Sequence, residues 1–188
     1  MYKKICITNR HLVQGDFLMQ LENVMHAEAD AVILREKDLT QEAYSLLAEK
    51  VQRICAGAHK EFICHTCAEV AMQLQADGLH LSAADFRRLP SDWKERNMKT
   101  GVSVHSAAEA EEMQAKGADY VIVSNIFPTD CKPGLPGKGT ELIRETKALL
   151  DIPVYALGGI TDEDAVRSCI EAGADGICMM SGYMKNAF

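Results

Sequence analysis

The sequence has no apolar stretch near the roughly 20 residues that a helix needs to cross a bilayer. Its first residues also lack the apolar core of a secretory signal peptide. Basic residues are in the minority, since 20 lysines and arginines stand against 27 aspartates and glutamates and the net charge is −7. A surface of that sign repels a polyanionic backbone. We therefore expect a cytoplasmic protein that binds neither membranes nor nucleic acids.

The sequence also lacks the regular cysteine spacing of a disulfide-rich domain. Its seven cysteines are odd in number and scattered, so we expect reduced and partly buried thiols. Cys64 and Cys67 form a C-x-x-C pair, which leaves a metal or redox role open. A single pair supplies only two of the ligands of a closed zinc site. Cys131, in a proline-rich loop, is the better candidate for a reactive thiol.

The chain does contain a fourfold repeat of Ala-Asp, one variable residue and an apolar run. The copies begin at Ala29, Ala76, Ala118 and Ala174, at separations of 47, 42 and 56 residues, each of which suits two βα units. Strands that are buried on both faces read as continuous apolar runs. Eight such runs alternating with helical segments predict a single (β/α)8 TIM barrel with parallel strands over residues 1–188. The four runs outside the repeat lie at 5–7, 62–64, 101–104 and 153–156.

Local signals give approximate limits for these elements. The second strand is expected to run to residues 35–37, and Thr40 is the expected N-cap of the helix that follows. Ser106 and Glu109 have the spacing of a capping box, so a helix should begin there. The longest loop is expected at 126–138, which holds three of the five prolines. Only six residues follow the eighth strand, so the eighth helix should be short or missing.

Small residues at two strand ends predict a phosphate site. In a barrel of this kind the active site lies at the carboxyl ends of the strands, with phosphate bound after strands seven and eight. Glycine lets backbone N–H groups approach an anion closely. The alternative is that these are ordinary turn glycines. The expected phosphate-binding residues are Gly158 and Gly159 after the seventh strand, and Met180, Ser181 and Gly182 after the eighth.

Arg35 and Lys37 form a second candidate feature at the end of the second strand. Residues two apart in an extended segment point to the same side, which suits binding of an anionic ligand. The alternative is a solvated strand end in which these cations pair with Glu36 or Asp38.

His65 and His105 end the third and fifth strands, on the expected functional face. An imidazole titrates near neutral pH and can transfer protons, so both are candidate acid/base residues. The alternative for each is a structural histidine.

Several motifs resemble one known family, the thiamine-phosphate synthase family, in order along nearly the whole chain. The loop Thr129-Asp130-Cys131-Lys132, with Gly134-Leu135 and Gly137-Lys138-Gly139, is most similar to the TenI branch, whose known activity is thiazole tautomerase. The other segments are Leu34-Arg35-Glu36-Lys37, Gly101-Val102-Ser103-Val104-His105-Ser106, Gly117-Ala118-Asp119-Tyr120-Val121, Ile126-Phe127-Pro128, Ile152 to Ile160, and Ala172 to Gly182.

The resemblance implies roles for single residues. Ser103, Thr129 and Lys132 match residues that contact pyrophosphate in the family, and Asp85 matches a metal-binding aspartate.

The chain departs from the family at three positions. Ile33 stands where the synthase has glutamine, and Thr66 stands where it has a second metal-binding aspartate. One carboxylate makes a poor magnesium site unless the diphosphate supplies the remaining charge. Asn125 replaces the proposed acid/base histidine of the tautomerase branch, and an amide orients groups but does not transfer protons near neutral pH. His65 is then the first choice for proton transfer and His105 the second.

Three functions follow and stay open. The first is a TenI-like isomerase that aromatises a thiazole carboxylate phosphate by proton transfer and requires no cofactor. The second is a thiamine-phosphate synthase that couples hydroxymethylpyrimidine diphosphate to a thiazole phosphate, with Mg²⁺ and release of pyrophosphate. The third is a non-catalytic protein that keeps the phosphate site. All three imply a small phosphorylated thiazole as partner, and a homo-oligomer is left open.

Overall fold

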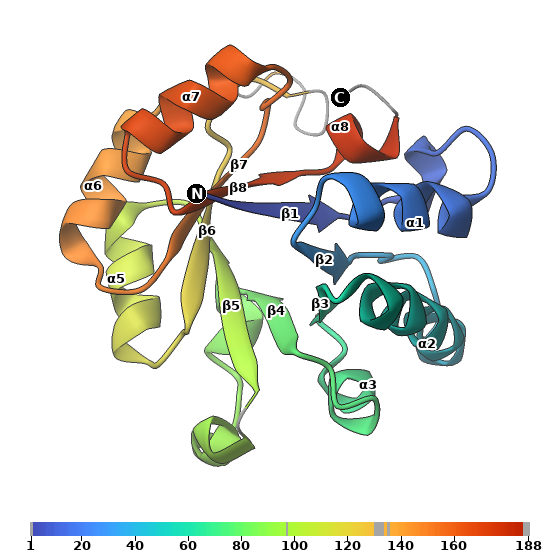
Figure 1. Cartoon of the computed structure of the whole chain (residues 1–188). Helices are drawn as coiled ribbons and strands as arrows, with labels where there is room; N and C mark the ends of the chain where they lie inside the picture. Colours follow the sequence, from blue (N-terminus) through green and yellow to red (C-terminus); the bar gives the residue numbers. More distant parts are fainter. Residues whose placement is uncertain (1, 97, 130–133, 135, 186–188) are drawn as a thin grey trace. The chain divides into compact units, whose positions relative to one another are not determined.

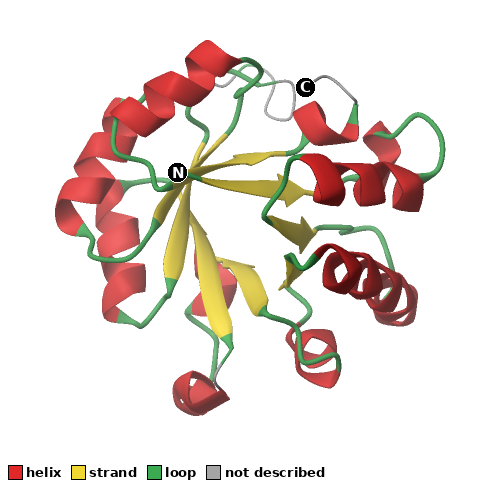
Figure 2. Cartoon of the chain, in the orientation of Figure 1, coloured by secondary structure: helices red, strands yellow, loops and turns green. Residues whose placement is uncertain are grey.

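The computed structural model describes residues 2–96, 98–129, 134 and 136–185. Its eight parallel strands are hydrogen-bonded in chain order and close into a barrel, so the predicted (β/α)8 fold is confirmed (Figures 1 and 2). The strands are β1 (Lys3–Ile7), β2 (Ala31–Leu34), β3 (Glu61–His65), β4 (Gly78–Ser82), β5 (Lys99–Val104), β6 (Tyr120–Ser124), β7 (Val154–Leu157) and β8 (Gly176–Met179).

Helical segments alternate with the strands along the chain. The last of them, α8, has four residues, which confirms the expected short eighth helix. No helix within the described ranges is long and apolar enough to cross a membrane. The helical segments are η1 (Arg10–Leu12), α1 (Phe17–Ala27), α2 (Gln41–Ala58), α3 (Ala68–Gln73), α4 (Ala83–Phe86), η2 (Ser91–Arg96), α5 (Ala107–Ala115), α6 (Glu141–Leu149), α7 (Glu163–Glu171) and α8 (Ser181–Met184).

The chain divides into two compact units. Unit 1 comprises residues 1–3 and 81–178, and unit 2 comprises residues 4–80 and 179–188. In unit 2, β2 is buried along its whole length between β1 and β3, and α1 packs against α2. In unit 1, β6 is likewise buried between β5 and β7, and α5 packs against α6.

The Ala-Asp repeat has a structural role at the amino ends of the strands. Each aspartate carboxylate accepts the N–H of a residue in the preceding strand, and the aspartate's own N–H donates to the carbonyl of that same residue. The carboxylate distances are 2.9 Å for Asp30 to Lys4, 2.8 Å for Asp77 to Phe62, 2.7 Å for Asp119 to Thr100 and 2.8 Å for Asp175 to Val154. The repeat thus joins successive strands at the end opposite to their carboxyl ends.

The second strand ends earlier than expected. β2 stops at Leu34, and the segment 35–37 lies beyond it. The reason is that side chains replace the strand ladder there. The Thr8 hydroxyl accepts the N–H of Arg35 at 2.9 Å, and the Tyr44 hydroxyl donates to the carbonyl of Leu34 at 2.8 Å.

The predicted helix starts are confirmed at two places. Thr40 accepts the N–H of Ala43, and Ser106 accepts the N–H of Glu109. The Glu109 carboxylate, however, accepts the N–H of His105 rather than that of Ser106. The loop expected at 126–138 lies partly outside the described residues.

Candidate functional site

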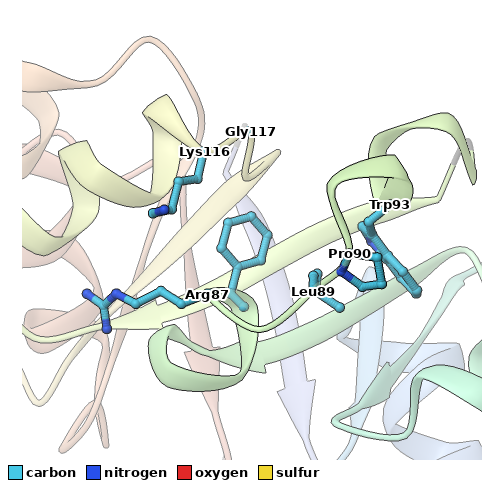
Figure 3. Close-up of a pocket in the computed structure, with 7 residues that line it drawn as sticks. Arg87, Leu89, Pro90, Trp93, Lys116 and Gly117 are labelled. Atoms are coloured by element: carbon cyan, nitrogen blue, oxygen red, sulfur yellow. The ribbon is translucent and has the colours of Figure 1, made fainter.

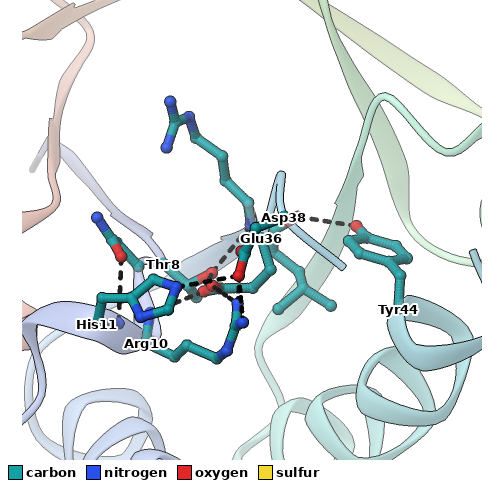
Figure 4. A network of polar contacts seen from close by, with 9 residues as sticks. Thr8, Arg10, His11, Glu36, Asp38 and Tyr44 are labelled. Carbon is teal, nitrogen blue, oxygen red and sulfur yellow. Dashed lines mark hydrogen bonds and ion pairs between the residues drawn. The ribbon is translucent and has the colours of Figure 1, made fainter. Parts of the chain in front are cut away.

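A buried carboxylate organises the carboxyl end of β2 in unit 2 (Figure 4). Glu36 Oε1 accepts the Thr8 hydroxyl at 2.7 Å and the N–H of Arg10 at 3.0 Å, and Oε2 accepts Arg10 Nη1 at 2.9 Å. The Glu36 side chain is 1% exposed. Burying an ionised carboxylate is unfavourable unless it is paired and hydrogen-bonded, and here three donors meet that requirement.

Arg10 joins this carboxylate to a second one. Its guanidinium also contacts both oxygens of Asp38, one of them at 2.7 Å, and His11 Nε2 lies 3.1 Å from Asp38 Oδ2. The Arg10 hydrogen bonds lower the pKa of the Asp38 carboxyl well below its usual range. The same contacts with Asp38 raise the pKa of Arg10. Both groups therefore stay ionised at every physiological pH.

The two cations predicted to bind an anion are not used in this network. Glu36 and Asp38 pair with Arg10, so the alternative interpretation, in which they pair with Arg35 and Lys37, is wrong. In the part of the chain that the structure describes, neither the Arg35 guanidinium nor the Lys37 ammonium pairs with a carboxylate. Binding of an anion by these two charges stays a prediction.

Tyr44 connects the ends of β2 and β3. Its hydroxyl donates to the carbonyl of Leu34 and accepts the N–H of His65 at 3.0 Å. Burial raises the pKa of this phenol, so it stays protonated. Thr66, which follows His65 in sequence, has φ +68°, a left-handed conformation that β-branched residues rarely adopt. Its hydroxyl lies 2.8 Å from His65 Nδ1.

His65 has a second imidazole beside it. The rings of His65 and His80 are 6.0 Å apart between centroids, and their strands pair in register at these two residues. His80 is 2% exposed, and burial, with a smaller effect from His65, lowers its pKa to about 3. His80 is therefore neutral near pH 7, whereas half-buried His65 is reachable from solvent. The arrangement leaves His65 as the acid/base candidate in unit 2.

The C-x-x-C pair shows no sign of redox or metal chemistry among the described residues. Burial raises the pKa of Cys64 to about 12 and also raises the pKa of Cys67. A thiol that resists ionisation is a weak nucleophile and a weak metal ligand. The described residues contain no group of three or more His, Cys, Asp or Glu that could hold a metal. Cys131 lies outside the described residues.

In unit 1, His105 is held in one tautomer. Its Nδ1 lies 2.9 Å from the carbonyl oxygen of Ser124 and 3.2 Å from the Ser124 hydroxyl. A carbonyl oxygen only accepts, so Nδ1 carries the proton and Nε2 of the neutral ring is the acceptor. Lys138 Nζ donates to the carbonyl of His105, which joins this strand end to the loop before α6. His105 is thus a candidate base with a defined free nitrogen.

The other residues predicted from the family resemblance are distributed along β5 and the loop after β6. Ser103 is half-buried in β5, and Thr129 is half-buried in the loop. Asn125 is buried, its side-chain amide lies 3.4 Å from the carbonyl of Pro136, and its own carbonyl accepts the N–H of Lys138. Lys132 lies outside the described residues.

The diglycine after β7 is explained first by packing. Gly158 and Gly159 have φ +109° and +67°, which favour glycine. A Cβ on Gly159 would lie 2.4 Å from the carbonyl oxygen of Pro128, and one on Gly158 would lie 2.9 Å from Asn125 Cβ. Both glycines therefore let the loops after β6 and β7 pack closely in unit 1. This agrees with the alternative interpretation, in which they are ordinary turn glycines. Phosphate binding there stays a prediction.

Met180, Ser181 and Gly182 belong to unit 2. They form the N-cap and the first residues of α8, which contacts η1, the segment that contains Arg10. The α1 residue Gln20 donates to the carbonyl of Tyr183 at 2.6 Å and holds α8 in place. The predicted phosphate-binding residues are therefore divided between the two units, with the diglycine in unit 1 and the residues after β8 in unit 2.

The residues present do not form a protein-built magnesium site. Asp85, in α4, accepts the Ser82 hydroxyl at 2.6 Å, and its other oxygen lies 3.5 Å from Arg88. Mg²⁺ is normally held by one or two carboxylates together with substrate phosphates. At the position of the second metal-binding aspartate of the family, this chain has Thr66, which offers no carboxylate. The donor set therefore does not fit a resident Mg²⁺.

A pocket in unit 1 is not the candidate site. It measures about 180 Å³ and is lined by residues that include Phe86, Trp93 and Lys116 (Figure 3). Lys116 and Gly117 precede β6, and Trp93 precedes β5, so the pocket adjoins the amino ends of these strands. Ligand pockets usually occupy about 300–1,000 Å³, and active sites of this fold lie at the other end of the strands.

Sequence reasoning missed Thr8, Arg10 and Tyr44. Thr8 and Arg10 follow the first apolar run directly, so their place at a carboxyl strand end was a usable signal. Tyr44 had no comparable signal, because a tyrosine on a helix is usually a packing residue.

Comparisons with known proteins show that the chain is similar to thiamine-phosphate synthases in sequence and in fold. Residues 5–183 match the thiamine monophosphate synthase family. A thiamine-phosphate synthase of Bacillus velezensis is 36% identical over 176 residues, covering 91% of this chain and 78% of the relative. A putative thiamine-phosphate synthase 2 of Aquifex aeolicus is 32% identical, covering 95% and 96%. A solved thiamine phosphate pyrophosphorylase from Pyrococcus furiosus superposes with a TM-score of 0.85 at 28% identity, covering 98% and 88%.

Proposed function

The chain belongs to the thiamine monophosphate synthase family, and we propose that it catalyses the coupling of a hydroxymethylpyrimidine diphosphate to a thiazole phosphate, with release of pyrophosphate. The observation that carries this proposal is the match of residues 5–183 to the family model, together with relatives that are named thiamine-phosphate synthase. It reverses the order of preference that the loop motif alone suggests, in which isomerisation comes first.

The positive charges of Arg35 and Lys37, just beyond the carboxyl end of β2, favour a reaction with an anionic leaving group. Arg35 and Lys37 have no carboxylate partner among the described residues, so their charge is available to a diphosphate. Arginine binds such oxygens with a planar fork of donors, whereas lysine acts as a point charge. Cations beside departing pyrophosphate stabilise the negative charge that develops as its bond breaks. Mg²⁺, brought by the diphosphate, would supply further charge of this kind.

Direct turnover tests the proposal. Purified protein is supplied with both substrates, with and without Mg²⁺, and thiamine phosphate and pyrophosphate are measured together. Equal formation of the two products supports coupling. Arg35→Ala should lower kcat/KM, while Arg53→Ala, on the exposed surface of α2, should not. Absence of product under all conditions would reject coupling.

A second function, isomerisation of a thiazole carboxylate phosphate, is favoured by one observation. Thr66 replaces a metal-binding aspartate and instead contacts Nδ1 of His65, a half-buried imidazole at a strand end. In this function His65 moves the proton. His65→Ala should then abolish aromatisation, followed by absorbance, while binding of thiazole phosphate persists. Binding without either turnover would indicate the non-catalytic alternative.

A further inference from the structure

We propose that Thr8, Arg10 and Glu36 are positioning residues that hold Arg35 and Lys37 ready for an anionic group of the substrate. The inference rests on the proposed function only in taking Arg35 and Lys37 as anion-binding residues. It assigns a role to a network that the substrate itself need not touch.

The backbone at Arg35 is held by side chains rather than by a strand ladder. β2 ends at Leu34, so the next residues have no regular pairing. The N–H of Arg35 instead donates to the Thr8 hydroxyl at 2.9 Å. That hydroxyl donates in turn to Glu36 Oε1 at 2.7 Å. A single fully buried side chain therefore fixes Arg35 and Glu36 together.

Glu36 lies between the two cations in sequence and is held by Arg10 as well as by Thr8. Its carboxylate is withdrawn from water and receives two further hydrogen bonds, from the N–H and the guanidinium of Arg10. A buried carboxylate that loses its charged partner is strongly destabilising. Glu36 is therefore held where Thr8 and Arg10 can reach it. Holding Glu36 also holds the backbone on both sides of it, from which Arg35 and Lys37 extend.

A segment that is ordered before the ligand arrives can bind it more tightly. Free arginine and lysine side chains on an unpaired segment lose conformational freedom when a ligand orders them. A segment that is already ordered pays less of that entropy at the moment of binding. The network therefore acts through Arg35 and Lys37, and its loss should weaken anion binding.

Calorimetric titration with inorganic pyrophosphate tests this, because it needs no turnover. Thr8→Val keeps the volume and removes the hydroxyl, and we expect it to raise the Kd about tenfold, the equivalent of one hydrogen bond to a charged group. Thr8→Ser restores the hydroxyl and should bind within about twofold of the unmodified protein. Arg10→Lys keeps the positive charge but loses the planar guanidinium that contacts Glu36 and Asp38. It provides a second test of the network if Thr8→Val does not fold.

A double-mutant cycle identifies the route of the effect. Thr8→Val added to Arg35→Ala should raise the Kd by a smaller factor than Thr8→Val does in the unmodified protein, since one of the two residues through which Thr8 acts is gone. The matched control is Glu112→Gln, which removes a two-point ion pair with Arg87 in unit 1 and should leave the Kd unchanged.

The outcomes separate this inference from the proposed function. If Arg35→Ala weakens binding and neither Thr8→Val nor Arg10→Lys does, the positioning role is wrong and the anion-binding assignment stands. Full additivity in the cycle would also overturn it. If Arg35→Ala and Lys37→Ala both bind as tightly as the unmodified protein, or the unmodified protein does not bind pyrophosphate, both assignments fail. Binding without coupling turnover would reject the proposed reaction alone.

Discussion

At the scale of single residues, burial decides which histidine can do chemistry. His80 and His65 face each other across two paired strands, yet His80 is almost fully buried and His65 is not. An imidazole that stays neutral down to about pH 3 cannot accept a proton from a substrate near pH 7. It can, however, make the folded state sensitive to acid.

The buried imidazole predicts a dependence of stability on pH. In the unfolded chain His80 titrates near its ordinary pKa of 6.5, whereas in the folded state it titrates near 3. Between these pH values the unfolded state binds more protons than the folded state. The contribution of neutral His80 to the free energy of unfolding is therefore fully present above pH 6.5, and it is lost as the pH is lowered toward 3. Urea titrations of His80→Asn should show a pH slope that is smaller by up to about 1.4 kcal/mol per pH unit. His26→Asn, at an exposed position, is the control, and an unchanged slope for His80→Asn would contradict the assignment.

Substitution of Thr66 by aspartate should increase both thermal stability and coupling activity. A β-branched residue in a left-handed conformation is strained by roughly 1 kcal/mol, and aspartate tolerates that conformation better. Thr66→Asp also restores the carboxylate that the family pattern has there. We expect it to raise thermal stability and to increase Mg²⁺-dependent coupling. Thr66→Ala supplies no carboxylate and serves as the control for coupling; a Thr66→Asp protein without improved coupling would argue against a metal role for this position.

At the scale of elements, the Ala-Asp repeat predicted strands correctly but not its own function. The apolar runs after each Ala-Asp are strands, as expected. The aspartates, however, join each strand pair at the amino end, where the fold places stability rather than catalysis. The sequence alone could not show this, because the N–H groups that the carboxylates accept lie 15 to 26 residues away along the chain.

Each aspartate of the repeat should therefore contribute to stability. Asp77→Ala removes the acceptor of the Phe62 N–H, and we expect it to lower the free energy of unfolding by about 1–2 kcal/mol. Asp119→Ala, which affects Thr100 in the same way, should cost a similar amount. Chemical denaturation measures both effects. Asp151→Ala, at an exposed site after α6, should change stability by less than about 0.5 kcal/mol, and equal losses at all three positions would contradict a special role for the repeat.

At the scale of the whole molecule, a phosphorylated thiazole should stabilise the native state. A ligand at 100 times its Kd adds about 2.7 kcal/mol to the free energy of unfolding. For a chain of 188 residues this corresponds to a rise in Tm of about 5–10 °C. Differential scanning fluorimetry with thiazole phosphate measures the shift. The unphosphorylated thiazole alcohol should give little, and an equal shift with both compounds would mean that the phosphate is not recognised.

The sequence by itself determined the eight strands, their order, the short last helix and the strand ends at which candidate residues gather. These properties follow from local apolar runs and capping residues, which can be read without knowing any contact. Only the tertiary structure decided that Arg10, rather than Arg35 or Lys37, neutralises Glu36, that His80 is buried beside His65, and that Gly159 leaves room for the Pro128 carbonyl. Those outcomes depend on burial and on hydrogen bonds between segments well separated along the chain. Neither hydrophobic periodicity nor motif spacing carries information about such pairings.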